Sequence, residues 1–265
     1  MYKRQREFYV NDAGNQIEKF GCSLEARYLQ IFKGDEIEFP EDGYQGEDIK
    51  DLAKEYADLN GDSLVNVSAE ERKKALVDYA LPKNIEKMQA DMEKYKIFYD
   101  KWFFESELHK SGAVKAVVDL LTKKGLTYEK EGAVWYKNKE VLTQKLLKEG
   151  KSQKYIDNLE LKDDVLIRQN GNPTYFTADI AYHKNKFDRG FTTLIDVWGA
   201  DHHGHVMRMK GAMDAIGYDG DKLNVVLMQL VKLVKDGELV KMSKRTGKAI
   251  QLGDLLDEVP VDSAR

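Results

Sequence analysis

The sequence has only one cysteine, Cys22, among 265 residues, so no internal disulfide can form and a reducing cytoplasm fits. No run of about 18 apolar residues occurs, so no segment is expected to span a membrane. The N-terminal stretch MYKRQREFYV has no apolar core and does not resemble a secretory signal. A formal net charge of -4 argues against a chain that acts as a whole as a nucleic-acid clamp. Internal repeats and low-complexity tracts are also lacking. We therefore expect a soluble cytoplasmic protein.

Enough apolar residues are present, 42% of the chain, to bury a sizeable core. The first part of the sequence predicts mostly helices. The elements expected there are a strand at 6–10, helices at 15–32, 48–59, 68–95 and 111–125, a hairpin at 126–138 and an exposed connection over 137–164. Ser68 and Glu71 have the spacing of a capping box, which fixes the start of the third helix. That helix is polar and rich in Lys and Glu, so we expect it at the periphery.

The second part has the pattern of an α/β protein. The expected elements are two strands within 164–177 joined at NGNP, a helix capped by Thr177 and running to about Phe187, a buried parallel strand at 192–198, a helix with an apolar stripe from Val206 to Ile216, and a strand region at 223–234 before a turn at KDGE. Strand, helix and strand in this order predict a doubly wound parallel sheet. Ligands of such sheets bind at the carboxyl ends of the strands.

A basic segment, GELVKMSKRTGKAI at 237–250, follows the last of these strands. Lys241, Ser243 and Lys244 lie in it between two glycines, and glycine lets a backbone approach a ligand closely. Two interpretations are open. In the first, the charged side chains simply lie on a solvated loop. In the second, they hold the oxygens of a polyphosphate and neutralise charge that develops during nucleotidyl transfer.

The segment GADHHGH at 199–205 places three of the five histidines beside Asp201. A metal site is disfavoured, because neighbouring histidines on one short turn do not obviously converge on a single ion. Two interpretations remain: a polar turn that caps a helix, or a small-molecule site at the end of a strand. Gly199 and Gly204 favour the second.

A third segment, TYFTADIAYH, has Tyr175 at the expected end of a strand and Asp179 in the first turn of the following helix. An ionised Asp179 can bind a guanidinium or ammonium group by a charge-assisted hydrogen bond. The alternative is that Asp179 simply stabilises the helix N-terminus electrostatically.

Five segments of the sequence resemble segments of one known protein family and occur in the same order as in that family. They are YVNDAGNQI, FPEDGYQGEDI, GNPTYFTADIAYH, VWGADHHGH and KMSKRTG. Together they resemble arginyl-tRNA synthetases of the bacterial type, within the class I aminoacyl-tRNA synthetases. The resemblance implies a Rossmann-like doubly wound parallel sheet with a mostly helical insertion. The domains it implies are part of the catalytic domain at 1–60, an insertion at 61–160, the rest of the catalytic domain at 161–256, and the start of an anticodon-binding helical domain at 257–265.

The resemblance also implies an activity: arginine and ATP, with Mg²⁺, give arginyl-adenylate, and arginine is then transferred to tRNA(Arg). Lys241 and Lys244 match catalytic positions that hold pyrophosphate. Tyr175, Asp179 and His202 match arginine-binding positions. The ATP-binding positions implied are Gly199, Asp201, His205, Met242 and Ser243, together with the two lysines. No residue is assigned to a metal. The first of the five segments, which contains Asn11, Asp12, Gly14 and Gln16, has no assigned chemical role. The complete enzyme is expected to be a monomer.

The sequence departs from the family in two places. The His-x-Gly-His motif of the family, together with its first strand and first helix, is missing from this sequence, and no histidine precedes His109. Most of the anticodon-binding domain and the N-terminal tRNA-binding extension are missing as well. We therefore expect an internal fragment that is inactive alone. The alternatives are a degenerate, non-catalytic paralogue that binds arginine, a nucleotide or another protein, and another class I synthetase such as the glutamyl type, which Asp179 opposes because it would repel an acidic substrate.

Overall fold

The computed structural model describes residues 4–229, 231–235, 238–239 and 251–265. Backbone contacts divide the chain into two compact units. The first, called here the α8–α9 unit, comprises Phe104–Val231. The second, called the α1–α3 unit, comprises Arg4–Phe103 and Lys232–Arg265. The predicted division at 60, 160 and 256 stays a prediction.

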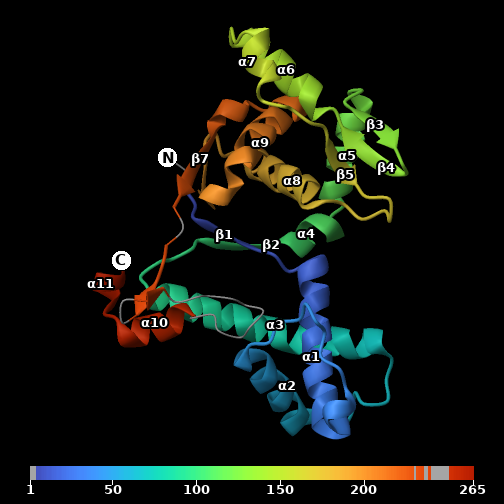
Figure 1. The fold of residues 1–265 in the computed structure, drawn as a ribbon, viewed down its shortest axis with the longest axis vertical. Helices are drawn as coiled ribbons and strands as arrows, with labels where there is room; N and C mark the ends of the chain where they lie inside the picture. Colours follow the sequence, from blue (N-terminus) through green and yellow to red (C-terminus); the bar gives the residue numbers. More distant parts are fainter. Residues whose placement is uncertain (1–3, 230, 236–237, 240–250) are drawn as a thin grey trace. The chain divides into compact units, whose positions relative to one another are not determined.

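The α1–α3 unit is mostly helical (Figure 1). Its elements are β1 (Glu7–Val10), α1 (Asn15–Lys33), the 3-10 turn η1 (Gly34–Glu36), α2 (Glu47–Asn60), α3 (Ala69–Lys94), β2 (Lys101–Phe104), β8 (Val234–Lys235), β9 (Glu238–Leu239), α10 (Leu252–Glu258) and α11 (Val261–Ala264). β1 pairs with β2, and β8 pairs with β9. The predicted strand at 6–10 and the helices at 15–32, 48–59 and 68–95 are confirmed to within about two residues at each end.

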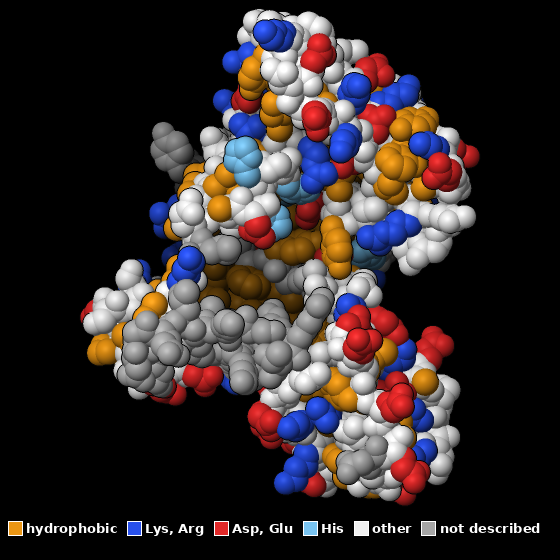
Figure 2. All heavy atoms as spheres, in the orientation of Figure 1, with side chains coloured by type: hydrophobic (Ala, Val, Ile, Leu, Met, Phe, Trp, Pro, Cys, Tyr) orange, Lys and Arg blue, Asp and Glu red, His pale blue; other side chains and the backbone are white. Residues whose placement is uncertain are grey.

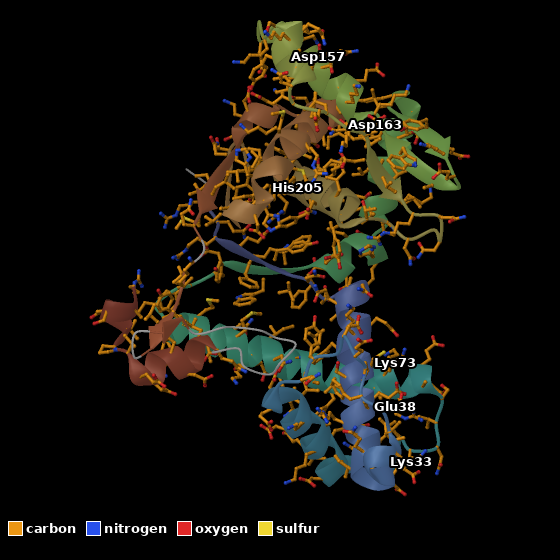
Figure 3. The ribbon with its side chains drawn as sticks, viewed as in Figure 1. Lys33, Glu38, Lys73, Asp157, Asp163 and His205 are labelled. Carbon is orange, nitrogen blue, oxygen red and sulfur yellow. The ribbon has the colours of Figure 1, made fainter. Side chains whose placement is uncertain are left out.

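The core of this unit lies between α1, α2 and α3. The apolar stripe of α1 buries Leu24 and Tyr28, which are 1% and 0% exposed. Ser68 and Glu71 form the predicted capping box at the start of α3. α3 was expected at the periphery, but it contributes Leu76 to this core. Its Lys73, labelled in Figure 3, lies on the side of α3 that faces α1 and pairs there with Glu18.

The α8–α9 unit mixes helices and strands. Its elements are α4 (Glu105–Lys110), α5 (Ala113–Lys123), β3 (Thr127–Lys130), β4 (Ala133–Tyr136), α6 (Asn138–Lys148), α7 (Gln153–Asp157), β5 (Asp164–Ile167), α8 (Tyr175–Asp188), β6 (Leu194–Gly199), η2 (Ala200–His202), α9 (His203–Ile216), η3 (Gly220–Lys222) and β7 (Leu223–Met228). β3, β4 and β5 form an antiparallel sheet, and β6 pairs with β7 in parallel. The parallel pair joined by a helix confirms the α/β class.

One face of β6 is covered and the other is exposed. Leu194 and Asp196 point to the covered face and are 5% and 9% exposed, whereas Ile195 and Val197 are each 68% exposed. The sequence predicted a buried parallel strand here; the parallel strand is confirmed, but only one of its two faces is buried. The apolar residues of β6 alternate between two faces, and within the described residues only the face toward α8 is packed.

Three further predictions are wrong. The segment 137–164 was expected to be an exposed connection, but it contains α6 and α7. Leu142 of α6 is 1% exposed and fills the place where Gly211 of α9 lacks a side chain, since an added Cβ there would lie 2.6 Å from its Cδ2 atom. The second strand expected within 164–177 is reduced to one bridge between Ile167 and Pro173, and α8 begins at Tyr175, before the predicted cap Thr177.

Candidate functional site

The start of α8 is fixed by two hydroxyl groups that bond to β5. Thr174 Oγ1 donates to the carbonyl oxygen of Val165 at 2.8 Å, and Thr177 Oγ1 donates to that of Leu166 at 2.7 Å. Tyr175 and Asp179 are therefore both on α8 and four residues apart, which puts them on the same helix face. The Tyr175 residue is 47% exposed and the Asp179 side chain 33%, so both are accessible from solvent.

His205 of α9 contacts the Asp179 carboxylate. Its Nε2 atom lies 3.0 Å from Asp179 Oδ2, and its Nδ1 atom lies 3.0 Å from a guanidinium nitrogen of Arg208. Arg208 in turn donates to Asp164 Oδ1 of β5 at 2.5 Å. The four side chains form a continuous hydrogen-bonded row, Asp179–His205–Arg208–Asp164, called here the Asp179–Asp164 row. The other carboxylate oxygen of Asp179, Oδ1, has no hydrogen-bond partner among the described residues.

Aromatic rings surround His205. Its ring centroid lies 5.3 Å from Trp198 of β6, 5.6 Å from Phe176 of α8 and 6.5 Å from His202 of η2. α8 and α9 lie side by side in Figure 1, and Figure 2 shows histidine side chains next to acidic ones on their unit. Figure 3 labels His205 at the start of α9. The structure thus brings together three of the predicted residues, Asp179, His202 and His205.

A buried cluster of charged side chains connects the same helix, α8, to strand β6. His183 Nε2 lies 2.5 Å from Asp196 Oδ2, and Lys186 Nζ lies 2.8 Å from Asp196 Oδ1. Burial raises the pKa of the Asp196 carboxyl, but the hydrogen bonds and charges of His183 and Lys186 outweigh burial and hold that pKa well below its usual range. Nδ1 of His183 faces the carbonyl oxygen of Asp179 at 2.7 Å, so this group ties the backbone of Asp179 to β6.

The other predicted residues do not join this cluster. Gly199 ends β6, and Asp201 follows it in η2 with a side chain that is 67% exposed. The predicted residues Lys241, Met242, Ser243 and Lys244 lie outside the described residues. The segment with Asn11, Asp12, Gly14 and Gln16 belongs to the α1–α3 unit. A cavity of about 500 Å³ near β3 and α6 is lined by none of the predicted residues.

Sequence reasoning missed Arg208 and Asp196. Arg208 lies three residues after His205 and shares its face of α9, but the predicted helical stripe began only at Val206, so the sequence did not place the two on one helix. A signal for Asp196 was available, since a carboxylate inside the apolar run TTLIDVW needs a buried partner. Asp164 carried no such signal, because it follows two other charged residues, Lys162 and Asp163, at the start of a strand.

No group of three or more His, Cys, Asp or Glu side chains among the described residues is placed to hold a metal ion. None of the helices in the described ranges is long and apolar enough to cross a membrane.

The family model described as the catalytic domain of class I (R) tRNA synthetases matches residues 30–265. The chain is 54% identical to an arginine–tRNA ligase of Ruminiclostridium cellulolyticum and 57% identical to one of Caldanaerobacter subterraneus, in both cases over 100% of the chain and 44% of the relative. It therefore spans less than half the length of these curated relatives.

The chain is also similar in fold to solved structures of arginyl-tRNA synthetases. A putative arginyl-tRNA synthetase from Campylobacter jejuni matches with a TM-score of 0.80 and 37% identity, over 99% of this chain and 53% of that one. An arginyl-tRNA synthetase of Thermus thermophilus matches with a TM-score of 0.60 over 95% of this chain and 45% of that one; at 18% identity this likeness concerns the fold alone.

Proposed function

Since the chain belongs to the family of class I (R) tRNA synthetase catalytic domains, we propose that it is the part of an arginine–tRNA ligase that binds and activates arginine. The observation that carries this proposal is the Asp179 carboxylate. It is one-third exposed, His205 holds one of its oxygens, and the other oxygen is open one helical turn from Tyr175. Such a carboxylate suits a planar cation with several N–H donors.

In this proposal, Asp179 Oδ1 accepts a hydrogen bond from the guanidinium of arginine. The pairing selects a positive side chain because a neutral ligand leaves the carboxylate charge uncompensated. Tyr175 lies on the same face of α8, and His202 lies beside the ring of His205, so both are available to line the ligand. The aromatic rings of Trp198 and Phe176 pack around the ring of His205, whose side chain is 13% exposed.

Arginine activation then proceeds by attack of its carboxylate on the α-phosphate of ATP. A carboxylate oxygen forms a bond to phosphorus, the bond to the bridging oxygen of the β-phosphate breaks, and pyrophosphate leaves with that electron pair. Gly199, Asp201 and His205 are proposed on the nucleotide side with Met242 and Ser243. Lys241 and Lys244 are proposed to stabilise the charge that builds on pyrophosphate. Transfer of arginine to tRNA(Arg), a monomeric state and a requirement for Mg²⁺ belong to the proposal too.

The test is isothermal titration of the chain with arginine and, separately, with ATP. Asp179→Ala should weaken arginine binding by about 2–5 kcal/mol, the cost of losing one partner of a desolvated charge pair, and should leave ATP binding unchanged. Asp188→Ala is the matched control, because it removes another aspartate of α8 that pairs with Lys184 and Tyr218 instead.

Citrulline, which carries a neutral ureido group in place of the guanidinium, gives a second arm of the test. The wild-type chain should bind arginine in preference to citrulline, and Asp179→Asn should remove that preference. Equal arginine affinity in the wild type and Asp179→Ala would mean that another group reads the ligand, and the proposed role of Asp179 would be withdrawn.

A further inference from the structure

We propose that Arg208 and Asp164 are positioning residues that hold His205 as a neutral imidazole with its proton on Nε2, and so keep the Asp179 carboxylate charged and available to the ligand. The inference deepens the proposed function and rests on it where arginine is concerned. Its structural basis is the Asp179–Asp164 row, which joins β5, α8 and α9.

The hydrogen-bond donors of the row fix the proton positions. A guanidinium has only N–H donors, so Nδ1 of His205 must accept the hydrogen bond from Arg208 with its lone pair. The remaining ring proton is then on Nε2, from which it is donated to the Asp179 carboxylate. His205 can take up a second proton only if Arg208 withdraws, because that proton would point at the guanidinium.

Asp164 holds Arg208 in the place that this requires. The Asp164 side chain is 14% exposed, and it accepts from the guanidinium at 2.5 Å. Burial raises the pKa of the Asp164 carboxyl, and the neighbouring Arg208 charge opposes that rise. The guanidinium carbon also lies 5.5 Å from the centre of the Phe176 ring, which limits the planes it can adopt.

The charge of His205 matters because Asp179 faces the ligand. A neutral imidazole donates one hydrogen bond and leaves the full negative charge on the carboxylate. An imidazolium would cancel that charge and repel a guanidinium ligand. Among the residues that the structure describes, the titratable or charged groups that face His205 are Asp179 from α8, Asp164 from β5 through Arg208, His202 from η2, and Arg208 on α9 itself. The rings of Trp198 and Phe176 do not titrate.

A direct test observes the proton itself. The chain has five histidines, so ¹H–¹⁵N spectra through two-bond couplings can resolve each ring, and the signals of His205 are identified as those lost in His205→Gln. In the wild type at pH 7, Nε2 should carry the proton and Nδ1 should have the shift of an unprotonated nitrogen. An Nδ1–H tautomer, or a doubly protonated ring at pH 7, would overturn the proposal. This measurement needs no ligand.

A second test measures arginine affinity between pH 5.5 and pH 8. In Arg208→Met the lone pair of Nδ1 is free to take up a second proton as pH falls, and the resulting imidazolium would cancel the charge of Asp179. Arginine affinity should therefore fall by about tenfold from pH 8 to pH 5.5 in this variant and stay nearly constant in the wild type. A lost structural contact alone would lower affinity equally at both pH values, and that result would also overturn the proposal.

Three variants keep this test interpretable. Arg208→Met leaves Asp164 unpaired, so the double variant Arg208→Met/Asp164→Asn removes that charge and should show the same pH dependence with a more stable fold. Arg208→Lys keeps a donor and should restore part of the wild-type behaviour. Lys184→Met is the matched control, because it removes a cation of α8 that pairs with Asp188 and should leave the pH profile unchanged.

Failure of this inference differs from failure of the proposed function. If Asp179→Asn leaves arginine binding intact, or the wild-type chain does not bind arginine, the proposed function fails, and the tautomer of His205 still decides the positioning role. If Asp179→Asn abolishes binding while Arg208→Met changes neither the tautomer nor the pH profile, Asp179 reads arginine without help from Arg208.

Discussion

His183 of α8 joins Asp196 of β6 through a contact of 2.5 Å between Nε2 and Oδ2, and both of its ring nitrogens point at acceptors. The carbonyl oxygen of Asp179 can only accept, and so can an ionised Asp196. Both ring nitrogens therefore carry protons when both contacts are made, and the imidazolium shares the Asp196 carboxylate with the ammonium of Lys186. The helix that carries Asp179 is thus fixed to the sheet by a buried group of three charges.

This group should make stability depend on pH in the acid range. The pKa of Asp196 is lowered in the folded chain, so its contribution is fully present above the unfolded-state pKa of about 3.9 and is lost as pH falls toward the lower folded value. We expect the free energy of unfolding in urea to fall between pH 5 and pH 2.5 in the wild type, and to fall less steeply in Asp196→Asn.

At pH 7 the same Asp196→Asn variant should be less stable by about 3–5 kcal/mol, because it leaves His183 and Lys186 buried without their anion. Asp119→Asn is the control, since Asp119 forms an exposed pair with Lys115. An acid slope that is the same in wild type and Asp196→Asn would show that other carboxylates govern acid unfolding.

Arg72 should be essential for the loop that precedes α3. Its side chain is 9% exposed, pairs with Glu25 at 2.6 Å, and donates to the carbonyl oxygens of Leu64, Val65 and Val67. Arg72→Met removes all four contacts and leaves Glu25 without its cation, so we expect a loss of about 3–5 kcal/mol in urea unfolding.

Two variants calibrate this result. Arg72→Lys keeps the charge but cannot reach the carbonyls with a planar fork, so its loss should be intermediate. Lys74→Met lies on the same helix and breaks only an exposed pair with Asp78, and it should change stability little. If Arg72→Met behaved like Lys74→Met, the buried contacts would contribute nothing net.

The turn between β3 and β4 should tolerate only some residues. Lys130 pairs with Ala133, so the turn has two residues, Glu131 and Gly132, with φ of 53° and 73°. These are the angles of a type I′ turn, which favours Asn followed by Gly. Gly132→Ala should cost about 1–2 kcal/mol, because a side chain in the left-handed region clashes with its own backbone.

At the neighbouring position a stabilising effect is expected: Glu131→Asn should raise the melting temperature, because Asn is favoured at this position of a type I′ turn. Thermal unfolding followed by circular dichroism measures both. A melting temperature unchanged by Gly132→Ala would mean that the turn adopts another conformation in solution.

Lys241→Ala and Lys244→Ala should slow formation of arginyl-adenylate without weakening arginine binding, because these charges are proposed to act in the transition state. Single-turnover adenylate formation is measured in a synthetase that contains this chain, with arginine affinity measured in parallel. Lys248→Ala serves as the control, since it removes a positive charge of the same segment outside the matched motif. If a variant lost arginine affinity while its rate of adenylate formation stayed unchanged, the motif would contact the amino acid instead.

Features that depend on near neighbours in the chain could be predicted from the sequence. The capping box of Ser68 and Glu71, the hairpin at Glu131 and Gly132, and the apolar stripe of α1 all formed as predicted, because each is stabilised within a few residues. The same holds for the residues of the site, which stand out in short motifs. Asp179 and His205 could be singled out in this way, but not the contact between them.

Only the tertiary structure decided how these residues meet. α8 begins at Tyr175 because Thr174 and Thr177 donate to carbonyl oxygens of β5. Tyr175 therefore lies on the same helix as Asp179 and not at the end of a strand, where the sequence had placed it. Within the polar segment 137–164, helix α6 packs through Leu142 against Gly211, a partner far along the chain. Contacts over such separations depend on the packing of whole elements, which no local pattern encodes. The pairing of Asp179 with His205, and of His205 with Arg208 and Asp164, was settled by the same packing.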